Sequence, residues 1–188
     1  RCGMGIKLGK VAKKAKSYDH ILIIMRHAKA EPSSEGGDRE RPLSDKGLKQ
    51  AKAVAKGLLG LKLVPDRIAC SAALRTQQTC ARMLKSFGDV PVVDYRQSLY
   101  DGGVQSVLDE LAHTKSKMRT LLVIGHEPTV SIASQWIASA DSEPAMLDLL
   151  NLGMSTASIA IFGSSKPFSE WQIHDGELLA VVNPKDFD

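Results

Sequence analysis

The chain alternates short runs of consecutive apolar residues with longer segments in which apolar residues recur at helical spacing. Such runs lie at residues 21–25 and 121–125, and residues 67–71 contain a shorter one, from Ile68 to Cys70. A strand that is covered on both faces of a parallel sheet has this unbroken apolar character, whereas a half-exposed strand alternates between apolar and polar residues. The pattern therefore predicts three buried, parallel strands.

Segments with helical periodicity separate these runs. After Ser44, which is suited to cap a helix start, the apolar residues Leu48, Ala51, Ala55 and Leu58 repeat at helical spacing. We also expect helices at 73–87, 104–114 and 129–138, strands at 90–94, 155–162, 171–174 and 178–182, a flexible loop at 30–41 and an irregular segment at 139–152. Alternating strands and helices imply an α/β fold, a single-domain, mainly parallel open sheet with helices on both faces.

Charge is distributed unevenly along the 188 residues. Six of the 25 Lys and Arg residues lie in residues 1–18, which contain no acid, so 19 basic residues face 21 acidic ones in the rest of the chain. We therefore divide the chain into a basic N-terminal arm or leader, 1–19, and a domain, 20–188. The nearly balanced domain does not indicate a nucleic-acid partner. We expect a cytoplasmic protein or, if the leader is the remnant of a transit peptide, a plastid or mitochondrial one.

The remaining composition excludes further classes. Three cysteines cannot all pair with one another, and they do not resemble a disulfide framework. No spacing of Cys, His, Asp and Glu resembles a metal-ligand cluster, so we expect neither a metal nor another cofactor. No apolar stretch is long enough to span a bilayer, and no membrane partner is expected.

Candidate chemistry lies where the strands end. The run 21–25 leads into Arg26 and His27, the run 121–125 into His126, and Arg75 follows the segment 67–71 on the expected first turn of a helix. Ligands of open α/β sheets bind beyond the carboxyl ends of the strands. Two arginines and two histidines at this edge would form a pocket for a dianion, which His27 could attack.

These residues carry a resemblance. The segment Met25-Arg26-His27-Ala28 resembles the Arg-His-Gly signature of the histidine phosphatase (phosphoglycerate-mutase-like) superfamily, and more closely its phosphohistidine phosphatase SixA subgroup. The similarity continues through residues 41–47, 50–51, 71–79 and 125–128, in the order of the family, and spans about residues 20 to 130. The alanine at position 28, where most members have glycine, also occurs in the SixA-like subgroup.

The resemblance implies a phosphoglycerate-mutase-like fold and a metal-independent phosphatase. In such an enzyme His27 is the nucleophile and forms a phosphohistidine intermediate, Arg26 and Arg75 hold the phosphate, and His126 binds it and stabilises the transition state. The residues themselves agree with these roles. Arginine pairs with two phosphate oxygens and stays charged, and two nearby arginines disfavour the imidazolium form of His27, which could not attack phosphorus.

The general acid is less clearly defined. The spacing favours Asp101, which precedes two glycines and could also be a solvated turn residue, and Glu127 is the next candidate. A phosphohistidine substrate needs little help from an acid because its imidazole leaves more readily than an alkoxide. Arg41 either lines the pocket or anchors a helix start. We expect no site role for three other histidines, His20, His113 and His174.

Three functions remain open. The first is dephosphorylation of phosphohistidine in a protein, which a short chain without an obvious cap over the site would admit. The second is hydrolysis of a small phosphorylated metabolite by the same chemistry. The third is a low-turnover phosphoprotein-binding module that holds the phosphate without an effective acid.

Overall fold

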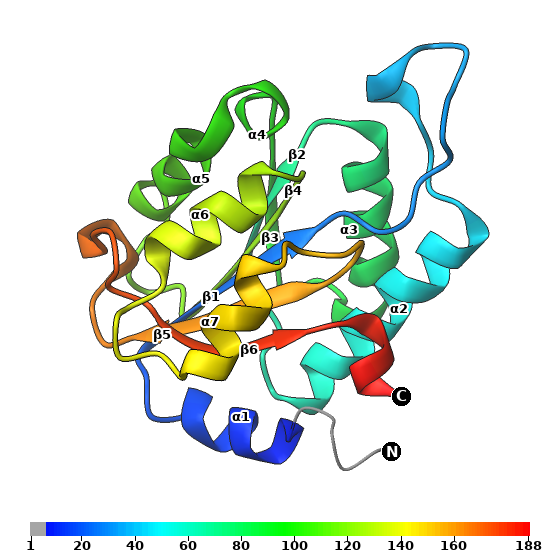
Figure 1. The fold of residues 1–188 in the computed structure, drawn as a ribbon. Coiled ribbons are helices and arrows are strands. Elements are labelled where there is room, and N and C mark those ends of the chain that lie inside the picture. The colour runs from blue at the N-terminus through cyan, green and yellow to red at the C-terminus, as the bar shows by residue number, and fades with distance from the viewer. Residues whose placement is uncertain (1–6) are drawn as a thin grey trace.

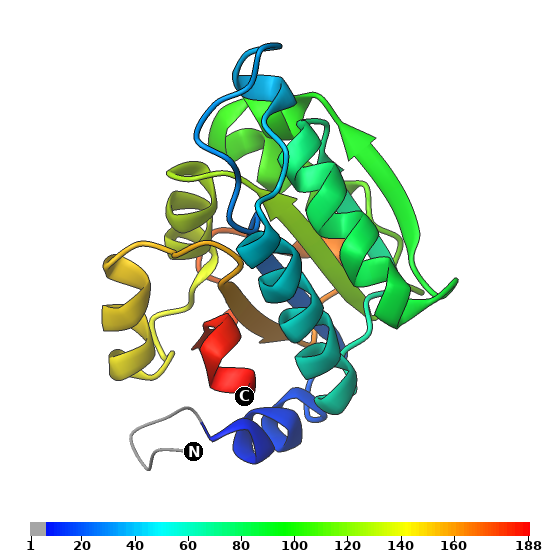
Figure 2. The same cartoon turned by 90° about the vertical axis from the view of Figure 1, so that its right-hand side faces the viewer.

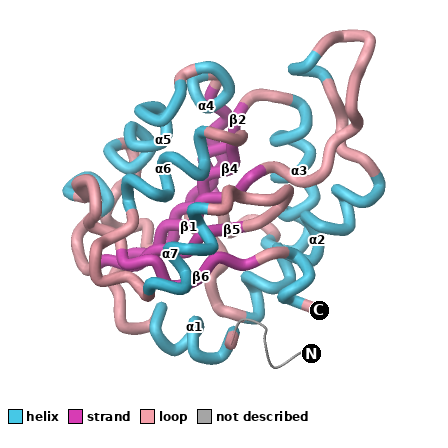
Figure 3. Tube along the Cα trace, viewed as in Figure 1, coloured by secondary structure: helices cyan, strands magenta, loops and turns pink. Residues whose placement is uncertain are grey.

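The protein is an α/β domain built on one six-stranded sheet. The structure, a computed structural model, describes residues 7–188. The strand order is β3-β2-β4-β1-β5-β6. The strands are β1 (His20–Arg26), β2 (Arg67–Ser71), β3 (Val92–Arg96), β4 (Thr120–Gly125), β5 (Ile159–Ser164) and β6 (Glu177–Val182). The strands β1 to β4 are parallel, β5 is antiparallel to both of its neighbours, and Figure 3 shows the single sheet they form. The predicted fold class is confirmed.

Seven helices surround the sheet in the described part of the chain. They are α1 (Leu8–Ala15), α2 (Asp45–Gly60), α3 (Leu74–Phe87), α4 (Ser98–Asp101), α5 (Gly103–Ala112), α6 (Thr129–Ile137) and α7 (Pro144–Asn151). Three short 3-10 turns are η1 (Asp38–Glu40), η2 (Phe168–Glu170) and η3 (Pro184–Phe187). Helices α1 to α3 pack on one face of the sheet and α4 to α7 on the other (Figures 1 and 2).

Both faces of the central strands are covered, which explains their unbroken apolar sequences. In β1, Ile21, Ile23 and Met25 pack under α1 to α3, while Leu22 and Ile24 pack under α4 to α7, and all five are fully buried. The strand β4 divides its side chains between the faces in the same way. Continuous apolar runs are what such two-sided burial requires.

Two expected segments differ from the structure. The segment 139–152, expected to be irregular, contains α7, in which Pro144 occupies the first turn, where a missing N–H costs no hydrogen bond. The strand expected at 171–174 is not formed. There Trp171 is buried and its indole N–H donates to the carbonyl of Lys166, and the chain turns through a positive φ of 67° at His174. The expected loop at 30–41 contains η1.

The basic segment 1–19 contains α1, which is packed against the sheet rather than free in solvent. Val11 and Ala15 are buried in the core, and the Arg119 guanidinium donates to the carbonyl oxygens of Ala15 and Tyr18 at 2.9 and 3.2 Å. Glu177 of β6 pairs with Lys14 and accepts a hydrogen bond from the Tyr18 hydroxyl. The boundary at residue 19 and any processing of this segment stay predictions, and residues 1–6 lie outside the described residues.

The first turn of α2 fixes the backbone just beyond the end of β1. The amide and hydroxyl of Ser44 both donate to the carbonyl oxygen of Lys29, and the Lys29 amide donates to the side chain of Gln50. Gly47 makes this approach possible, because a Cβ at this position would lie 2.0 Å from the Lys29 carbonyl oxygen. The helix thereby supports the chain two residues after His27.

We therefore expect Gly47→Ala to destabilise the fold. Because the clash is with backbone, α2 or residues 28–30 must shift, at a cost of about 1–3 kcal/mol in the free energy of unfolding. Urea unfolding would measure the change. Gly60→Ala in the same helix is the matched control, because nothing lies within 4 Å of the place its methyl group would take, and it should be neutral or slightly stabilising. Equal stability of the two variants would contradict this account of the Lys29 contact.

Candidate active site

The structure brings His27, His126 and Arg75 together at the carboxyl ends of β1 and β4. Arg26 pairs with Gly125 in the parallel register of these strands, so His27 and His126, the next residues, lie side by side with ring centroids 5.3 Å apart. Arg75, near the start of α3 after β2, places its Nε 3.3 Å from the His27 Nε2 atom. Neighbouring parallel strands thus supply the cluster.

The His27 ring is held in the form that can act as a nucleophile. Its Nδ1–H donates to the carbonyl oxygen of Ala28 at 2.7 Å, which leaves the lone pair on Nε2, and this atom accepts from Arg75. Burial, opposed by the Ala28 hydrogen bond and reinforced by the charges of Arg75 and Arg26, lowers the pKa of His27 to about 4. A neutral imidazole with its lone pair on Nε2 is the reactive form, and in this structure that lone pair accepts the Arg75 N–H.

His126 presents a second neutral ring. Its Nε2 lies 2.7 Å from the Ser71 hydroxyl, which itself accepts from the Ala73 amide, and its buried Nδ1 has no partner in the described residues. Burial, together with the charge of Arg75 and the neighbouring His27, lowers the pKa of His126 to about 3. If the Ser71 hydroxyl donates to Nε2, Nδ1 carries the ring proton and is a free donor for an anion.

The Arg26 guanidinium is anchored through one nitrogen and has another nitrogen without a partner in the described residues. Its Nη1 donates to the carbonyl oxygen of Met154 at 3.0 Å, whereas its buried Nε has no partner in the described residues. The Met154 amide donates to Glu127, which also accepts from the amide and the hydroxyl of Ser131 at the start of α6. Glu127, the second candidate for the general acid, therefore positions the loop that holds Arg26.

Sequence reasoning missed the partner of Arg75. Asp38 in η1 accepts from Arg75 through its backbone carbonyl at 2.8 Å and its carboxylate at 3.2 Å. The same carboxylate accepts from the Tyr100 hydroxyl at 2.7 Å and from Arg41 Nε at 3.0 Å. The loop that contains η1 stands beside α3 and α4 at the top of Figure 2.

This arrangement sets the direction of the Arg75 guanidinium. Asp38 occupies the Nη1 and Nη2 ends, so the edge that carries Nε faces His27. The hydrogen bond from Tyr100, together with the arginines, lowers the pKa of Asp38 to about 2, so this carboxylate stays ionised. Tyr100 also packs edge-on against the His126 ring, with centroids 5.5 Å apart. In the sequence, the only sign of this network is the three-residue spacing between Asp38 and Arg41, which allows the two side chains to pair.

Asp101 lies one residue beyond Tyr100, at the end of α4. Its side chain is exposed and accepts from Gln97 at 3.1 Å. Its role as a general acid stays a prediction. Among residues 7–188 no group of three or more His, Cys, Asp or Glu side chains could hold a metal ion, and no helix there is long and apolar enough to cross a membrane.

Comparison with known proteins identifies similar sequences and folds. A family model described as the histidine phosphatase superfamily (branch 1) matches residues 22–99. An uncharacterized protein of Mycobacterium tuberculosis is 33% identical over 139 residues, 73% of this chain and 85% of that protein. A solved structure from Nakamurella multipartitia, provisionally assigned as the phosphohistidine phosphatase SixA, is 31% identical, covers 88% of this chain and 96% of its own, and has a TM-score of 0.75. A mycobacterial glucosyl-3-phosphoglycerate phosphatase shares the fold at 18% identity, with 87% and 98% coverage and a TM-score of 0.59.

The clamp on Arg75 predicts that Asp38→Ala lowers kcat for a small phosphoramidate by about ten- to a hundredfold, because the guanidinium loses its fixed orientation. Asp38→Asn should lose less, since its amide oxygen still accepts from Arg75. Steady-state kinetics would separate kcat from KM. Glu40→Ala, a change at an exposed carboxylate of the same 3-10 turn, is the control and should leave both unchanged. Wild-type kcat in Asp38→Ala would exclude a positioning role.

The lowered histidine pKa values predict that His27 and His126 remain neutral between about pH 7.5 and about pH 5.5, unlike an unperturbed histidine. Their Cε1–H resonances, assigned with the two alanine variants, should not shift in this range. Because the unfolded chain binds these protons at higher pH than the folded one, the fold loses stability as the pH falls from about 6.5 toward 4. Titration of either resonance near pH 6.5 would contradict the buried, arginine-flanked environment.

Proposed function

Because the chain belongs to the histidine phosphatase superfamily and is therefore a phosphatase, we propose that it hydrolyses phosphohistidine in proteins through a covalent intermediate on His27. The observation that carries the proposal is the state of His27. Its Nδ1 is fixed by Ala28, and its Nε2 lone pair lies 3.3 Å from Arg75 Nε, where a phosphoryl group bound to that arginine would be presented for attack.

The reaction has two displacements. The His27 Nε2 lone pair attacks phosphorus, a new N–P bond forms, and the N–P bond of the substrate breaks, with its electron pair going to the leaving imidazole nitrogen. Water then attacks the phosphorus on His27, which releases inorganic phosphate and restores the neutral ring. Arg26, Arg75 and His126 stabilise the extra charge on the oxygens in both transition states. Given these donors, we propose that no metal ion is required.

The carboxylates near the site favour a nitrogen leaving group. Asp38 is held ionised by Tyr100 and Arg75, Glu127 is occupied by Ser131 and Met154, and Asp101 is exposed and bound to Gln97. An alkoxide leaving group needs a proton donor, an effect worth about a hundred- to ten-thousandfold. A phosphohistidine can bring its own proton on the imidazole. The 31% identity to the chain assigned as SixA supports the same substrate class.

A small phosphorylated metabolite is the second candidate substrate. The fold that this chain shares with the glucosyl-3-phosphoglycerate phosphatase favours it, because the named substrate of that protein is a small phosphorylated molecule. In that case Asp101 would have to supply the proton, and Asp101→Asn would lower turnover of phosphomonoesters much more than turnover of phosphoramidates.

The central test is a comparison of wild type with His27→Ala on a phosphohistidine peptide, a phosphoramidate and common phosphomonoesters. We expect the peptide and the phosphoramidate to be preferred, activity to survive EDTA, and labelled phosphate to be trapped on His27. His27→Ala should retain less than about a thousandth of the wild-type rate. His113→Ala, at an exposed histidine, is the control. Preference for phosphomonoesters would reassign the substrate, and substantial activity without His27 would exclude the covalent route.

A further inference from the structure

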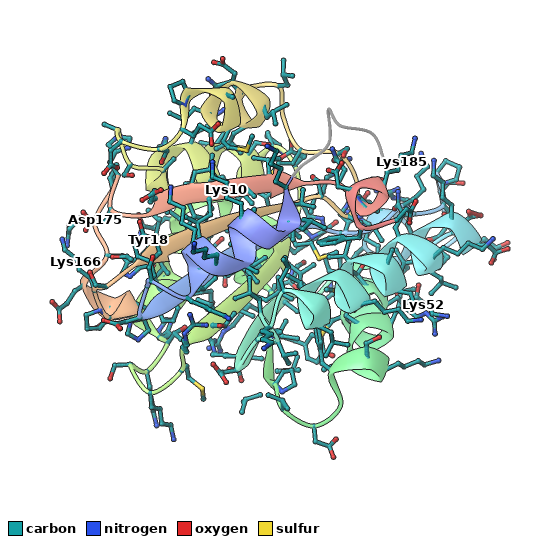
Figure 4. The ribbon with its side chains drawn as sticks, turned by 90° about the horizontal axis from the view of Figure 1, so that it is seen from below. Lys10, Tyr18, Lys52, Lys166, Asp175 and Lys185 are labelled. Atoms are coloured by element: carbon teal, nitrogen blue, oxygen red, sulfur yellow. The ribbon has the colours of Figure 1, made fainter. Side chains whose placement is uncertain are left out.

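The fold joins two sets of lysines that are far apart in the sequence. Helix α1 carries exposed lysines on its outer side, and α2 carries another row on the face turned away from the core. Lys10 of α1, Lys52 of α2 and Lys185 of η3 all appear in the view from below (Figure 4). The exposed lysines of this face, which we call the basic face, are Lys10, Lys46, Lys49, Lys52, Lys56 and Lys185.

The basic face encloses a groove with an apolar floor. The groove has a volume of about 580 Å³ and lies between α1, α2 and η3. Leu8 and Ala12 of α1, Leu61 after α2 and Phe187 of η3 contribute apolar surface, while Lys49, Lys52 and Lys56 line the α2 side. A second hollow of similar volume adjoins it through Lys49 and extends toward Lys185. The combined surface can accept acidic side chains and an apolar one together.

The lysines on the α2 side of this face have no acidic partner in the described part of the chain. Lys49, Lys52 and Lys56 have no carboxylate within ion-pair distance among residues 7–188, whereas Lys14 of α1 is paired with Glu177. Two acids lie at the η3 end, Asp186, which accepts from the Asn183 amide, and Asp188. The α2 side of the groove is therefore the part that attracts negative charge.

We propose that this groove docks an acidic segment of the phosphoprotein substrate, a segment with several Asp or Glu residues and one apolar side chain. The inference rests on the proposed function, since only a protein substrate can reach both the groove and His27. The lysines of α2 attract the acidic side chains of the segment, and the apolar floor of the groove binds its apolar side chain. A membrane surface fits less well, because an interfacial helix inserts its apolar side, and Val11 and Ala15 of α1 are already buried in the core.

The position of α2 links the groove to the site. Its N-cap, Ser44, is bonded to Lys29, two residues from His27, and Lys56 lies twelve residues further along the helix. At 1.5 Å per residue the distance along the helix is about 18 Å. A flexible peptide of about 20 residues spans about 25 Å, so one chain can occupy both positions. Docking would then raise the local concentration of the phosphohistidine without altering the chemical step.

The test uses two synthetic peptides. Both peptides carry a phosphohistidine, a Gly/Ser spacer of about 20 residues and a terminal segment. In the first peptide the terminal segment is rich in Asp and Glu and contains one leucine. In the second peptide Gln replaces each of these acidic residues. We expect the acidic peptide to have a KM about tenfold lower at low salt with the same kcat, because charged patches raise the association rate. The difference should vanish at about 0.5 M salt.

Matched charge reversals locate the effect. In Lys52→Glu/Lys56→Glu the advantage of the acidic peptide should be lost, while kcat/KM for a phosphoramidate stays unchanged. In Lys115→Glu/Lys117→Glu, the same change at exposed lysines between α5 and β4, the advantage should persist. Equal KM values for the two peptides on the wild type, or equal loss in both variants, would overturn the proposal.

A binding measurement separates this proposal from the proposed function. Fluorescence anisotropy of the unphosphorylated acidic peptide should show binding to the wild type and to His27→Ala, and none to Lys52→Glu/Lys56→Glu. If neither phosphohistidine peptide is hydrolysed but this binding is found, the proposed substrate is wrong. The groove is then still a binding site for acidic peptides. Tighter binding of anionic lipid vesicles or of a DNA oligonucleotide, lost in the same variant, would assign the basic face to that partner instead.

Discussion

The parallel pairing of β1 with β4 is the constraint on which the site depends. Because Arg26 lies opposite Gly125 in this register, the residues that follow each strand emerge side by side, and both are histidines. A shift of one residue would move each side chain of β1 to the opposite face of the sheet and would place Arg26 or Ala28, instead of His27, beside His126. The two apolar layers that cover β1 resist such a shift, so the packing of the core determines the distance between the two rings.

The site holds positive charge close to a histidine that stays unprotonated at neutral pH. Burial supplies the largest contribution by lowering the pKa of His27, and Arg75 and Arg26 reinforce it. The arginines are in turn oriented by groups of the protein, Arg75 by Asp38 and Arg26 by the carbonyl of Met154. The carboxylates of Asp38 and Glu127 therefore orient the cationic groups, Asp38 directly and Glu127 through the loop that holds Arg26.

The sequence predicts the parts of this arrangement that depend on local pattern. Unbroken apolar runs identify β1, β2 and β4, and the strand ends identify His27, Arg75 and His126 as neighbours. The Asp38 contact could not be predicted in this way, because Asp38 lies 37 residues from Arg75 and 62 from Tyr100, within a loop whose polar composition indicates only flexibility. Helix α7 was missed because a proline that starts a helix resembles, in a single sequence, one that ends it.

The strand order has a consequence for the folding of the nascent chain. β4 lies between β2 and β1, so the first three strands to be synthesised cannot form a continuous sheet by themselves. The segment that carries the family signature, residues 22–99, ends before β4 and leaves the two halves of the parallel sheet without the strand that joins them. We therefore expect that the sheet cannot bring His27 and Arg75 into their final positions until residue 125 has emerged from the ribosome and β4 has been inserted between β1 and β2.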